Sequence, residues 1–140
     1  MVRGEAFADT SALYAAVDAR NTHHRNAALL MRRLAQTGQM IVTSDYVLAE
    51  TLNLAVARRG RIVADRLLQL LETSAGLRME WIGPERFLAA KAFFRKHGDH
   101  GYSFTDCTSF IVMRELQIRD ALTSDRHFAE AGFRPLLKRI

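Results

Sequence analysis

Short apolar segments alternate with longer segments of helical periodicity along this chain. The apolar segments predict strands that end at Phe7-Ala8 and that cover residues 40–42, 77–82, 120–123 and 133–137. The helical periods predict helices over residues 11–17, from 21 or 22 to about 35, from 45 to about 59, and over 63–73, 84–96, 103–117 and 126–131. Strands that alternate with helices indicate βαβ units, and therefore a mainly parallel sheet covered on both faces.

Single residues support several of these boundaries. Gly38 and Gly60 follow the second and third predicted helices, where a glycine commonly ends a helix. Pro84 suits a first helical turn, and Ser103 suits the position that opens the next helix. With two prolines and eight glycines, the chain has no stretch typical of a linker. We therefore expect residues 1–140 to form one α/β domain.

The composition is close to that of an ordinary globular protein, with 49% hydrophobic and 25% charged residues. Cys107 is the single cysteine, which excludes an internal disulfide and favours a reducing compartment. The first ten residues carry Glu5 and Asp9 and have no long apolar run, so we expect no signal peptide. No window approaches the roughly 18 apolar residues of a membrane span. We therefore expect a soluble, cytoplasmic protein.

The chain is basic, with a net charge of +5 and a pI near 10.0. This excess favours a polyanionic partner, either a nucleic acid or an acidic protein. The basic residues are scattered, with small clusters at 32–33, 58–61, 95–96 and 138–139. Charge alone leaves open that the surface is basic without such a partner.

Two acidic residues come at the ends of predicted strands. Asp9 directly follows Phe7-Ala8, and Asp125 follows the strand at 120–123. Parallel sheets bind ligands beyond the carboxyl ends of their strands, so both carboxylates are expected to face one crevice. Each also has a structural alternative. Asp9 suits a turn or a helix cap, and Asp125 suits a cap of the next helix or a pair with Arg126.

Two further acidic residues lie on helix faces that border apolar positions. Glu50 shares one side of its helix with Leu54, and Asp106 is in line with Phe110. The structural alternatives are a rim position for Glu50 and a capping box between Asp106 and Ser103.

Together, Asp9, Glu50, Asp106 and Asp125 favour a bound cation. Four separate elements each bring a carboxylate toward one sheet edge, and carboxylates about 4 Å apart repel by roughly 4 kcal/mol per pair. A hard cation such as Mg²⁺ or Mn²⁺ offsets this repulsion. Two such ions activate a water and stabilise the leaving oxygen in phosphodiester cleavage, and a basic chain attracts the phosphate backbone. The acids therefore predict a metal-dependent nuclease.

At this point the chain resembles the PIN-domain family, and especially the VapC-type toxins of toxin–antitoxin pairs. The resemblance spans essentially the whole chain, and its motifs are specific in this order and spacing. They are Asp-Thr-Ser at 9–11, Val-Leu-Ala-Glu-Thr at 47–51, Tyr-Ser-Phe-Thr-Asp-Cys-Thr-Ser-Phe at 102–110 and Thr-Ser-Asp-Arg-His-Phe at 123–128.

The resemblance implies a three-layer α/β/α sandwich and endonucleolytic cleavage of RNA with Mg²⁺ or Mn²⁺. It implies that Asp9 and Asp106 are the principal metal ligands, and that Glu50 and Asp125 complete the metal shell or position the water. Two further residues are implied to support these ligands from behind: Ser11 and, by its position before the 103–106 stretch, Asp99.

The resemblance also implies a homodimer and a cognate antitoxin. Such an antitoxin threads an apolar and basic segment along a groove beside the active site. Here the helices around residues 48–56 and 62–71 are expected to line that groove. The alternative is that the leucines at 67, 68, 70 and 71 belong to the core.

Other kinds of site are disfavoured. A lone cysteine gives no zinc motif with the five histidines, so Cys107 is interpreted as a packing residue and His127 as a surface residue. No nucleophile elbow or phosphate-binding glycine loop occurs. Asp-x-Asp phosphatases need an aspartate where Ser11 stands, and receiver domains need paired acids at the first strand. A housekeeping PIN nuclease in RNA maturation and a non-catalytic nucleic-acid-binding module stay open as alternative functions.

Overall fold

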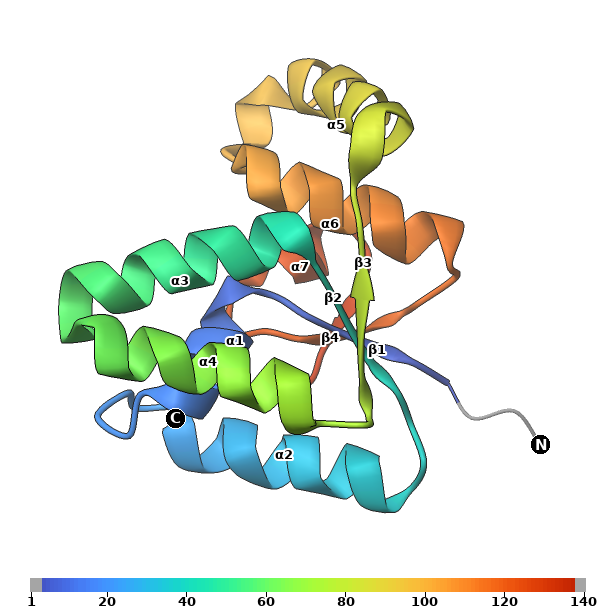
Figure 1. Ribbon diagram of the computed structural model, residues 1–140. Helices are drawn as coiled ribbons and strands as arrows, with labels where there is room; N and C mark the ends of the chain where they lie inside the picture. Colours follow the sequence, from blue (N-terminus) through green and yellow to red (C-terminus); the bar gives the residue numbers. More distant parts are fainter. Residues whose placement is uncertain (1–3, 138–140) are drawn as a thin grey trace.

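A computed structural model describes residues 4–137 of the chain (Figure 1). Every predicted strand is present in one sheet of order β3-β2-β1-β4-β5, in which all paired neighbours run parallel. The strands are β1 (Ala6–Ala8), β2 (Ile41–Ser44), β3 (Leu77–Glu80), β4 (Asp120–Leu122) and β5 (Arg134–Pro135). The last two residues predicted for β3 fall outside it, because the Ile82 backbone N–H donates instead to Asp45 Oδ1 at 2.8 Å.

The predicted helices are also present, with small shifts at their ends. They are α1 (Thr10–Val17), α2 (His24–Gln36), α3 (Asp45–Arg59), α4 (Arg61–Thr73), α5 (Gly83–Lys96), α6 (Phe104–Glu115) and α7 (Arg126–Glu130). Helix α2 begins at His24, later than predicted, because Asn21 Oδ1 accepts the His23 backbone N–H at 2.9 Å and holds a turn there. A one-turn 3₁₀ helix, η1 (Gly98–His100), was not predicted.

The order of the strands determines which face of the sheet each helix covers. The chain moves from β1 to β2 to β3 in one direction, then crosses to β4 and β5 on the other side of β1. Right-handed crossovers therefore put α1–α4 on one face and α5–α7 on the other, which gives the predicted three layers (Figure 1). The direction changes between β1 and β4, and a crevice opens at the carboxyl ends of these two strands.

The core lies between the sheet and its two helical layers. All three β1 side chains are buried, as are Val42 of β2 and Leu122 of β4. Phe110 of α6 and Phe128 of α7 pack edge to face against each other and are fully buried. This packing fixes the ends of β1 and β4 and the first turns of α6 and α7, the elements that carry three of the four predicted acids.

Within residues 4–137, no helix is both long and apolar enough to cross a membrane. The basic cluster predicted at residues 138–139 lies outside the described part of the chain.

Candidate active site

Asp9 occupies the turn between β1 and α1, where it caps the helix. Its Oδ1 accepts the Ala12 backbone N–H at 3.0 Å and the Ser11 hydroxyl at 2.7 Å. Its Oδ2 accepts the Thr123 hydroxyl at 2.6 Å. The predicted helix cap is therefore present, and it orients the carboxylate that the metal-site hypothesis needs.

Two hydroxyl groups join the end of β1 to the end of β4. The Thr123 hydroxyl donates to Asp9 and accepts the Asp125 backbone N–H at 2.9 Å. The Ser11 hydroxyl donates to Asp9 and accepts the Ser124 backbone N–H at 3.0 Å. Ser11 thus lies behind Asp9, where the resemblance places a supporting residue. Thr123 lies behind Asp9 in the same way. It is part of the 123–128 motif, but the motif alone did not indicate a supporting role for it.

The environment of Asp9 disfavours its charge. Burial raises its pKa from 3.8 to about 7, against the opposing effect of hydrogen bonds from Thr123, Ser11 and Ala12. The nearby carboxylate of Asp125 raises the pKa further. Only 5% of Asp9 is exposed. A cation next to this carboxylate would reverse the effect of burial and hold it ionised.

Asp106 and Asp125 each sit at a helix N-terminus. Asp106 forms the predicted capping box: its Oδ2 accepts the Ser103 backbone N–H at 3.1 Å, and the Ser103 hydroxyl accepts the Asp106 N–H at 3.0 Å. Asp125 caps α7, and its Oδ1 accepts the His127 backbone N–H at 2.9 Å. Burial raises the pKa of Asp106, and the Asp125 carboxylate adds to this shift. Asp106 and Asp125 can therefore each cap a helix and still contribute a carboxylate to the cluster formed with Asp9 and Glu50.

His127 is not the surface residue that the sequence suggested. Its side chain is 21% exposed, and its Nδ1 lies 3.4 Å from both Asp106 Oδ2 and Asp125 Oδ1. Its ring packs edge to face against Tyr102, with 5.4 Å between the ring centroids. The prediction failed because His127 is the second residue of a five-residue helix, which is too short to show which side faces inward.

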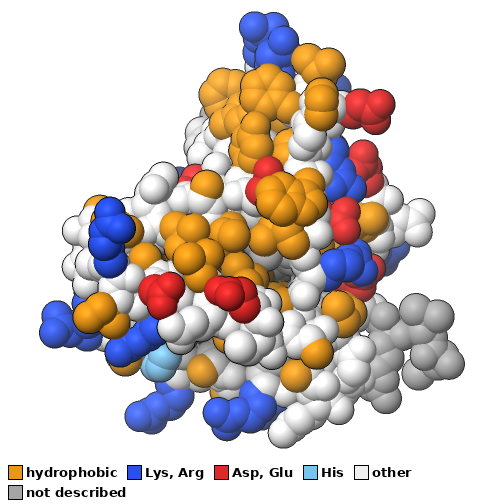
Figure 2. Space-filling view, in the orientation of Figure 1, with side chains coloured by type: hydrophobic (Ala, Val, Ile, Leu, Met, Phe, Trp, Pro, Cys, Tyr) orange, Lys and Arg blue, Asp and Glu red, His pale blue; other side chains and the backbone are white. Residues whose placement is uncertain are grey.

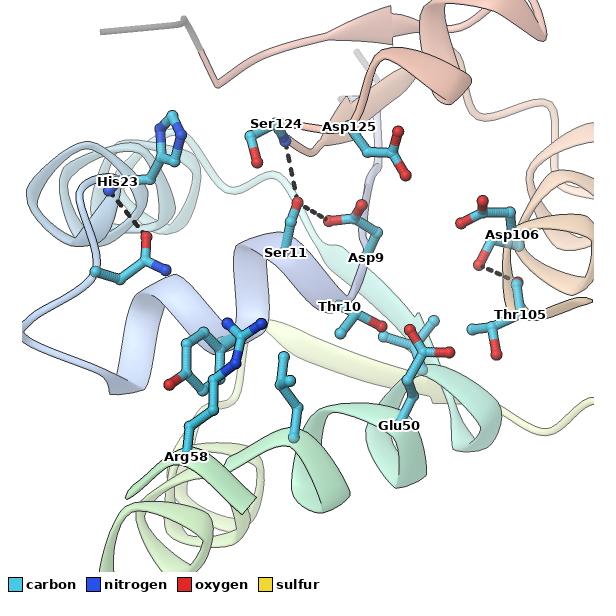
Figure 3. A pocket seen from close by; sticks show the side chains of 15 residues that line it. Asp9, Thr10, Ser11, His23, Glu50, Arg58, Thr105, Asp106, Ser124 and Asp125 are labelled. Atoms are coloured by element: carbon cyan, nitrogen blue, oxygen red, sulfur yellow. Dashed lines mark hydrogen bonds between the residues drawn. The ribbon is translucent and has the colours of Figure 1, made fainter. Parts of the chain in front are cut away.

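The four predicted acids line one pocket of about 270 Å³. Figure 3 shows Asp9, Asp106 and Asp125 around a common space, with Glu50 reaching toward it from α3. Glu50 itself is exposed, so it occupies the rim of the pocket as its position beside Leu54 indicated. Thr105 and Ser109 of α6 complete this end of the pocket.

The opposite end of the same pocket carries groups that bind anions. Arg58 of α3 and His23 and Asn21, which precede α2, line it. The Arg58 guanidinium lies over the Tyr14 ring, 5.5 Å from its centroid. The sequence indicates only a basic cluster at 58–61. Without the fold, nothing placed Arg58 in the same pocket as Asp9.

Asp99 is the predicted site residue that the structure does not bring to the cluster. Its side chain is 83% exposed in η1, and its recorded ion pair is with His100, at 3.8 Å. It is not among the residues that line the acidic pocket. Cys107, in contrast, is fully buried, as predicted for a packing residue, and burial raises the pKa of its thiol to about 11.

Comparison with known proteins decides between the classes of site. The family described as PIN domain matches residues 6–134, almost all of the chain. The chain belongs to the PIN-domain family. Nucleases of this family use divalent metal ions, and the acidic pocket supplies oxygen ligands of the kind such ions bind.

A curated relative from Mycobacterium tuberculosis, the 23S rRNA-specific endonuclease VapC20, is 34% identical over 129 residues. The match covers 91% of this chain and 94% of that protein, and the sequences from two strains match equally. The crystal structure of the same protein, described as a sarcin–ricin loop cleaving toxin, matches with a TM-score of 0.84 and 30% identity. It covers 96% of this chain and 100% of the other.

These findings confirm the predicted family, the α/β/α fold and the function class. The chain is a PIN-domain nuclease of the toxin type.

Proposed function

We propose that this protein is a single-domain endoribonuclease that hydrolyses RNA phosphodiester bonds with Mg²⁺ or Mn²⁺. The observation that carries the proposal is the convergence of Asp9, Glu50, Asp106 and Asp125, from separate elements, on one pocket. Asp9 and Asp106 are proposed as the principal metal ligands, with Asp125 completing the set and Glu50 at the rim.

The donor set fits a hard divalent cation. The four side chains offer carboxylate oxygens, which are the ligands preferred by Mg²⁺ and Mn²⁺. Asp9 is buried among neutral hydrogen-bond donors, so an added cation compensates the unfavourable ionisation that its raised pKa reflects. When bound, such ions activate water for attack on phosphorus and stabilise the leaving oxygen.

The protein groups around the acids position and attract the substrate. Thr123 and Ser11 fix the Asp9 carboxylate from behind through hydrogen bonds of 2.6 and 2.7 Å. Arg58, at the other end of the pocket, is placed to bind a phosphate next to the one that is cleaved. Glu50 is exposed at the rim, where its carboxylate can accept a hydrogen bond from the attacking water.

We further propose that the substrate is the RNA of the large ribosomal subunit, at its sarcin–ricin loop. The relative named for this activity is similar over nearly the full length of both chains, in sequence and in fold. A structured loop with unstacked bases is also the kind of RNA that proteins recognise by sequence.

Purified protein incubated with intact ribosomes tests both parts of this proposal. Primer extension should show one cleavage site in the sarcin–ricin loop, which EDTA abolishes and added Mg²⁺ or Mn²⁺ restores. Cleavage that persists in EDTA would overturn the metal proposal. Metal-dependent cleavage of another RNA, with an intact loop, would overturn the substrate alone.

The proposed partners are a cognate antitoxin and a second copy of the chain. Figure 2 shows apolar side chains gathered over α3 and α4 and, separately, over α5. On α3 and α4 the exposed ones are Val56, Ile62 and Leu68, whereas Leu67 is fully buried and Leu70 and Leu71 are partly buried. The predicted groove helices thus contain both core and exposed leucines. We assign this surface to the apolar segment of the antitoxin.

The second apolar surface is formed by side chains on and next to α5. Trp81 is 71% exposed, and Phe87, Leu88 and Phe94 are also exposed. We assign it to the homodimer contact. Light scattering of the purified protein should give twice the monomer mass. Trp81→Glu should reduce this mass to that of the monomer, whereas Ile62→Glu on the antitoxin surface should leave the dimer intact.

A further inference from the structure

The Nδ1 atom of His127 lacks a hydrogen-bond partner even though it is buried. Among residues 4–137, it is one of a few buried side-chain nitrogen or oxygen atoms of this kind. A buried imidazole nitrogen without a partner is unfavourable by about 1–3 kcal/mol. The atom faces Asp106 Oδ2 and Asp125 Oδ1 at equal distances of 3.4 Å. These contacts are longer than an N–H···O hydrogen bond.

The three atoms are spaced like ligands of one metal ion. Ligands about 2.1 Å from an ion lie about 3.0 Å apart in octahedral geometry and about 3.4 Å apart in tetrahedral geometry. The ligand atoms of Asp106, Asp125 and His127 all lie within 4.8 Å of one another. The three side chains therefore suit a shared cation better than they suit direct hydrogen bonds.

Neighbouring groups hold all three side chains in this arrangement. Asp106 Oδ2 also accepts the Ser103 backbone N–H, and Asp125 Oδ1 accepts the His127 backbone N–H, so helix caps fix both carboxylates. The Tyr102 ring packs against the imidazole. Phe128, which follows His127, is fully buried and anchors α7. Such fixed orientation is what a ligand side chain needs from its surroundings.

We propose that His127 Nδ1 is a direct metal ligand, which forms a mixed nitrogen–oxygen site together with Asp106 and Asp125, two of the carboxylates that line the acidic pocket. This inference rests on the proposed function, because it adds a ligand to the proposed metal centre. Imidazole binds transition metals more readily than Mg²⁺. His127 therefore shifts the preference of the site from Mg²⁺ toward Mn²⁺.

Mn²⁺ binding to the full-length protein tests the proposal without measuring activity. Pulsed electron paramagnetic resonance of the Mn²⁺-loaded protein should show the ¹⁴N coupling of a directly bound imidazole. His127→Ala should lose that coupling and bind Mn²⁺ at least about tenfold more weakly. The ratio of Mn²⁺ to Mg²⁺ affinity should fall with it. His127→Asn, which places an oxygen near the position of Nδ1, should recover part of the affinity but not the ¹⁴N signal.

His100→Ala is the matched control, because His100 also packs on Tyr102, with 5.0 Å between the ring centroids, but does not belong to the group of neighbouring ligand atoms formed by Asp106, Asp125 and His127. It should leave both the coupling and the affinity unchanged. Wild-type protein that binds Mn²⁺ without ¹⁴N coupling would overturn the His127 assignment and leave the proposed function intact. An equal loss of Mn²⁺ and Mg²⁺ affinity in His127→Ala would also overturn it. Failure of the wild type to bind any divalent ion would instead overturn the proposed function.

Discussion

Helix α1 carries a buried aspartate at each end: Asp9 before its first turn and Asp18 after its last. Asp9 is 5% exposed and Asp18 is 4% exposed, but burial is the largest influence on the pKa of Asp9 only. Asp18 accepts the Tyr14 hydroxyl at 2.5 Å and the Arg20 backbone N–H at 3.0 Å, and it pairs with the Arg59 guanidinium. The Tyr14 hydrogen bond, assisted by Arg20 and Arg59, outweighs burial and lowers the pKa of Asp18.

Among residues 4–137, Asp9 has hydrogen-bond donors but no cationic partner of this kind. Ser11, Thr123 and Ala12 are all neutral, and its pKa is raised to about 7. Asp18, which joins α1 to α3, is thus paired with an arginine. The described partners of Asp9, which faces the pocket, are neutral hydrogen-bond donors only. A buried carboxylate prepared in this way is suited to a cation from solution.

Replacing Asp9 is expected to have the largest effect. Asp9→Asn keeps the shape of the side chain but removes a principal metal ligand, so cleavage should fall by on the order of 10³-fold, about 4 kcal/mol in activation free energy. The rate of ribosome cleavage at saturating Mn²⁺ measures this. Asp99→Asn is the matched control, because Asp99 is 83% exposed and lies outside the pocket. A comparable loss in Asp99→Asn would restore the supporting role that the resemblance implies for it.

Replacing Asp18 should affect stability rather than cleavage. Asp18→Asn leaves Arg59 without its partner and should reduce the free energy of unfolding by about 3 kcal/mol, the low end for a broken buried pair. The low end applies because the Arg59 side chain is 23% exposed. Urea denaturation measures the loss, and the exposed Asp65→Asn should change it by less than about 0.5 kcal/mol. If Asp18→Asn abolished cleavage while folded, the division of roles between the two aspartates would be wrong.

The sequence predicted the acidic residues of the pocket better than it predicted the side chains that hydrogen-bond or pair with buried aspartates. Asp9, Asp106 and Asp125 each follow a local signal, either a strand end or a helix start, and those signals depend on only a few neighbouring residues. The Thr123 hydroxyl reaches Asp9 across 114 positions of the chain, and Arg59 reaches Asp18 across 41. Such contacts depend on how strands and helices pack, which periodicity does not determine.

The same distinction explains why His127 and Asp99 lie elsewhere than the sequence indicates. The sequence indicates a surface position for His127, because α7 spans only five residues and shows no apolar period. The family resemblance implied a supporting role for Asp99, because an acid often precedes the 103–106 stretch in that family. Asp99 instead lies within η1, where its side chain is 83% exposed. The strand order itself, which puts Asp9 and Asp125 at the change of crossover direction, also required the structure.

The stability of the metal-free protein should fall as the pH rises through the pKa of Asp9. The folded-state pKa, about 7, lies above the unfolded value of 3.8. The stabilising contribution of protonated Asp9 is therefore complete below pH 3.8 and is lost as the pH rises through about 7. Asp106, whose pKa is also raised, acts in the same direction. The lowered pKa of Asp18 places its own transition below pH 3.8, outside this window.

Urea denaturation in EDTA at pH 5 and pH 8 measures this effect. The slope from Asp9 is at most about 1.4 kcal/mol per pH unit. Asp9→Asn should remove most of the difference between the two pH values, and saturating Mn²⁺ should stabilise the wild type at pH 8. An unchanged pH difference in Asp9→Asn would show that Asp9 is charged in the metal-free fold, as Asp18 is.

The smallest expected effect comes from replacing Thr123, and it tests whether this residue orients Asp9 or only stabilises the fold. Thr123→Val removes the donor to Asp9 Oδ2 and the acceptor of the Asp125 N–H. Thr43→Val, in β2, removes an equally buried hydroxyl that donates to the Ala8 carbonyl at 2.9 Å. Each should lose about 1 kcal/mol of unfolding free energy.

Cleavage should distinguish these two threonines. Thr123→Val lets the Asp9 carboxylate rotate and should slow cleavage by about tenfold, equivalent to about 1.4 kcal/mol. Thr43→Val should cleave at the wild-type rate, because neither Thr43 nor Ala8 lines the pocket. Equal rates in the two variants would mean that Ser11 and the Ala12 N–H alone fix Asp9, and that Thr123 serves only to join β1 to β4.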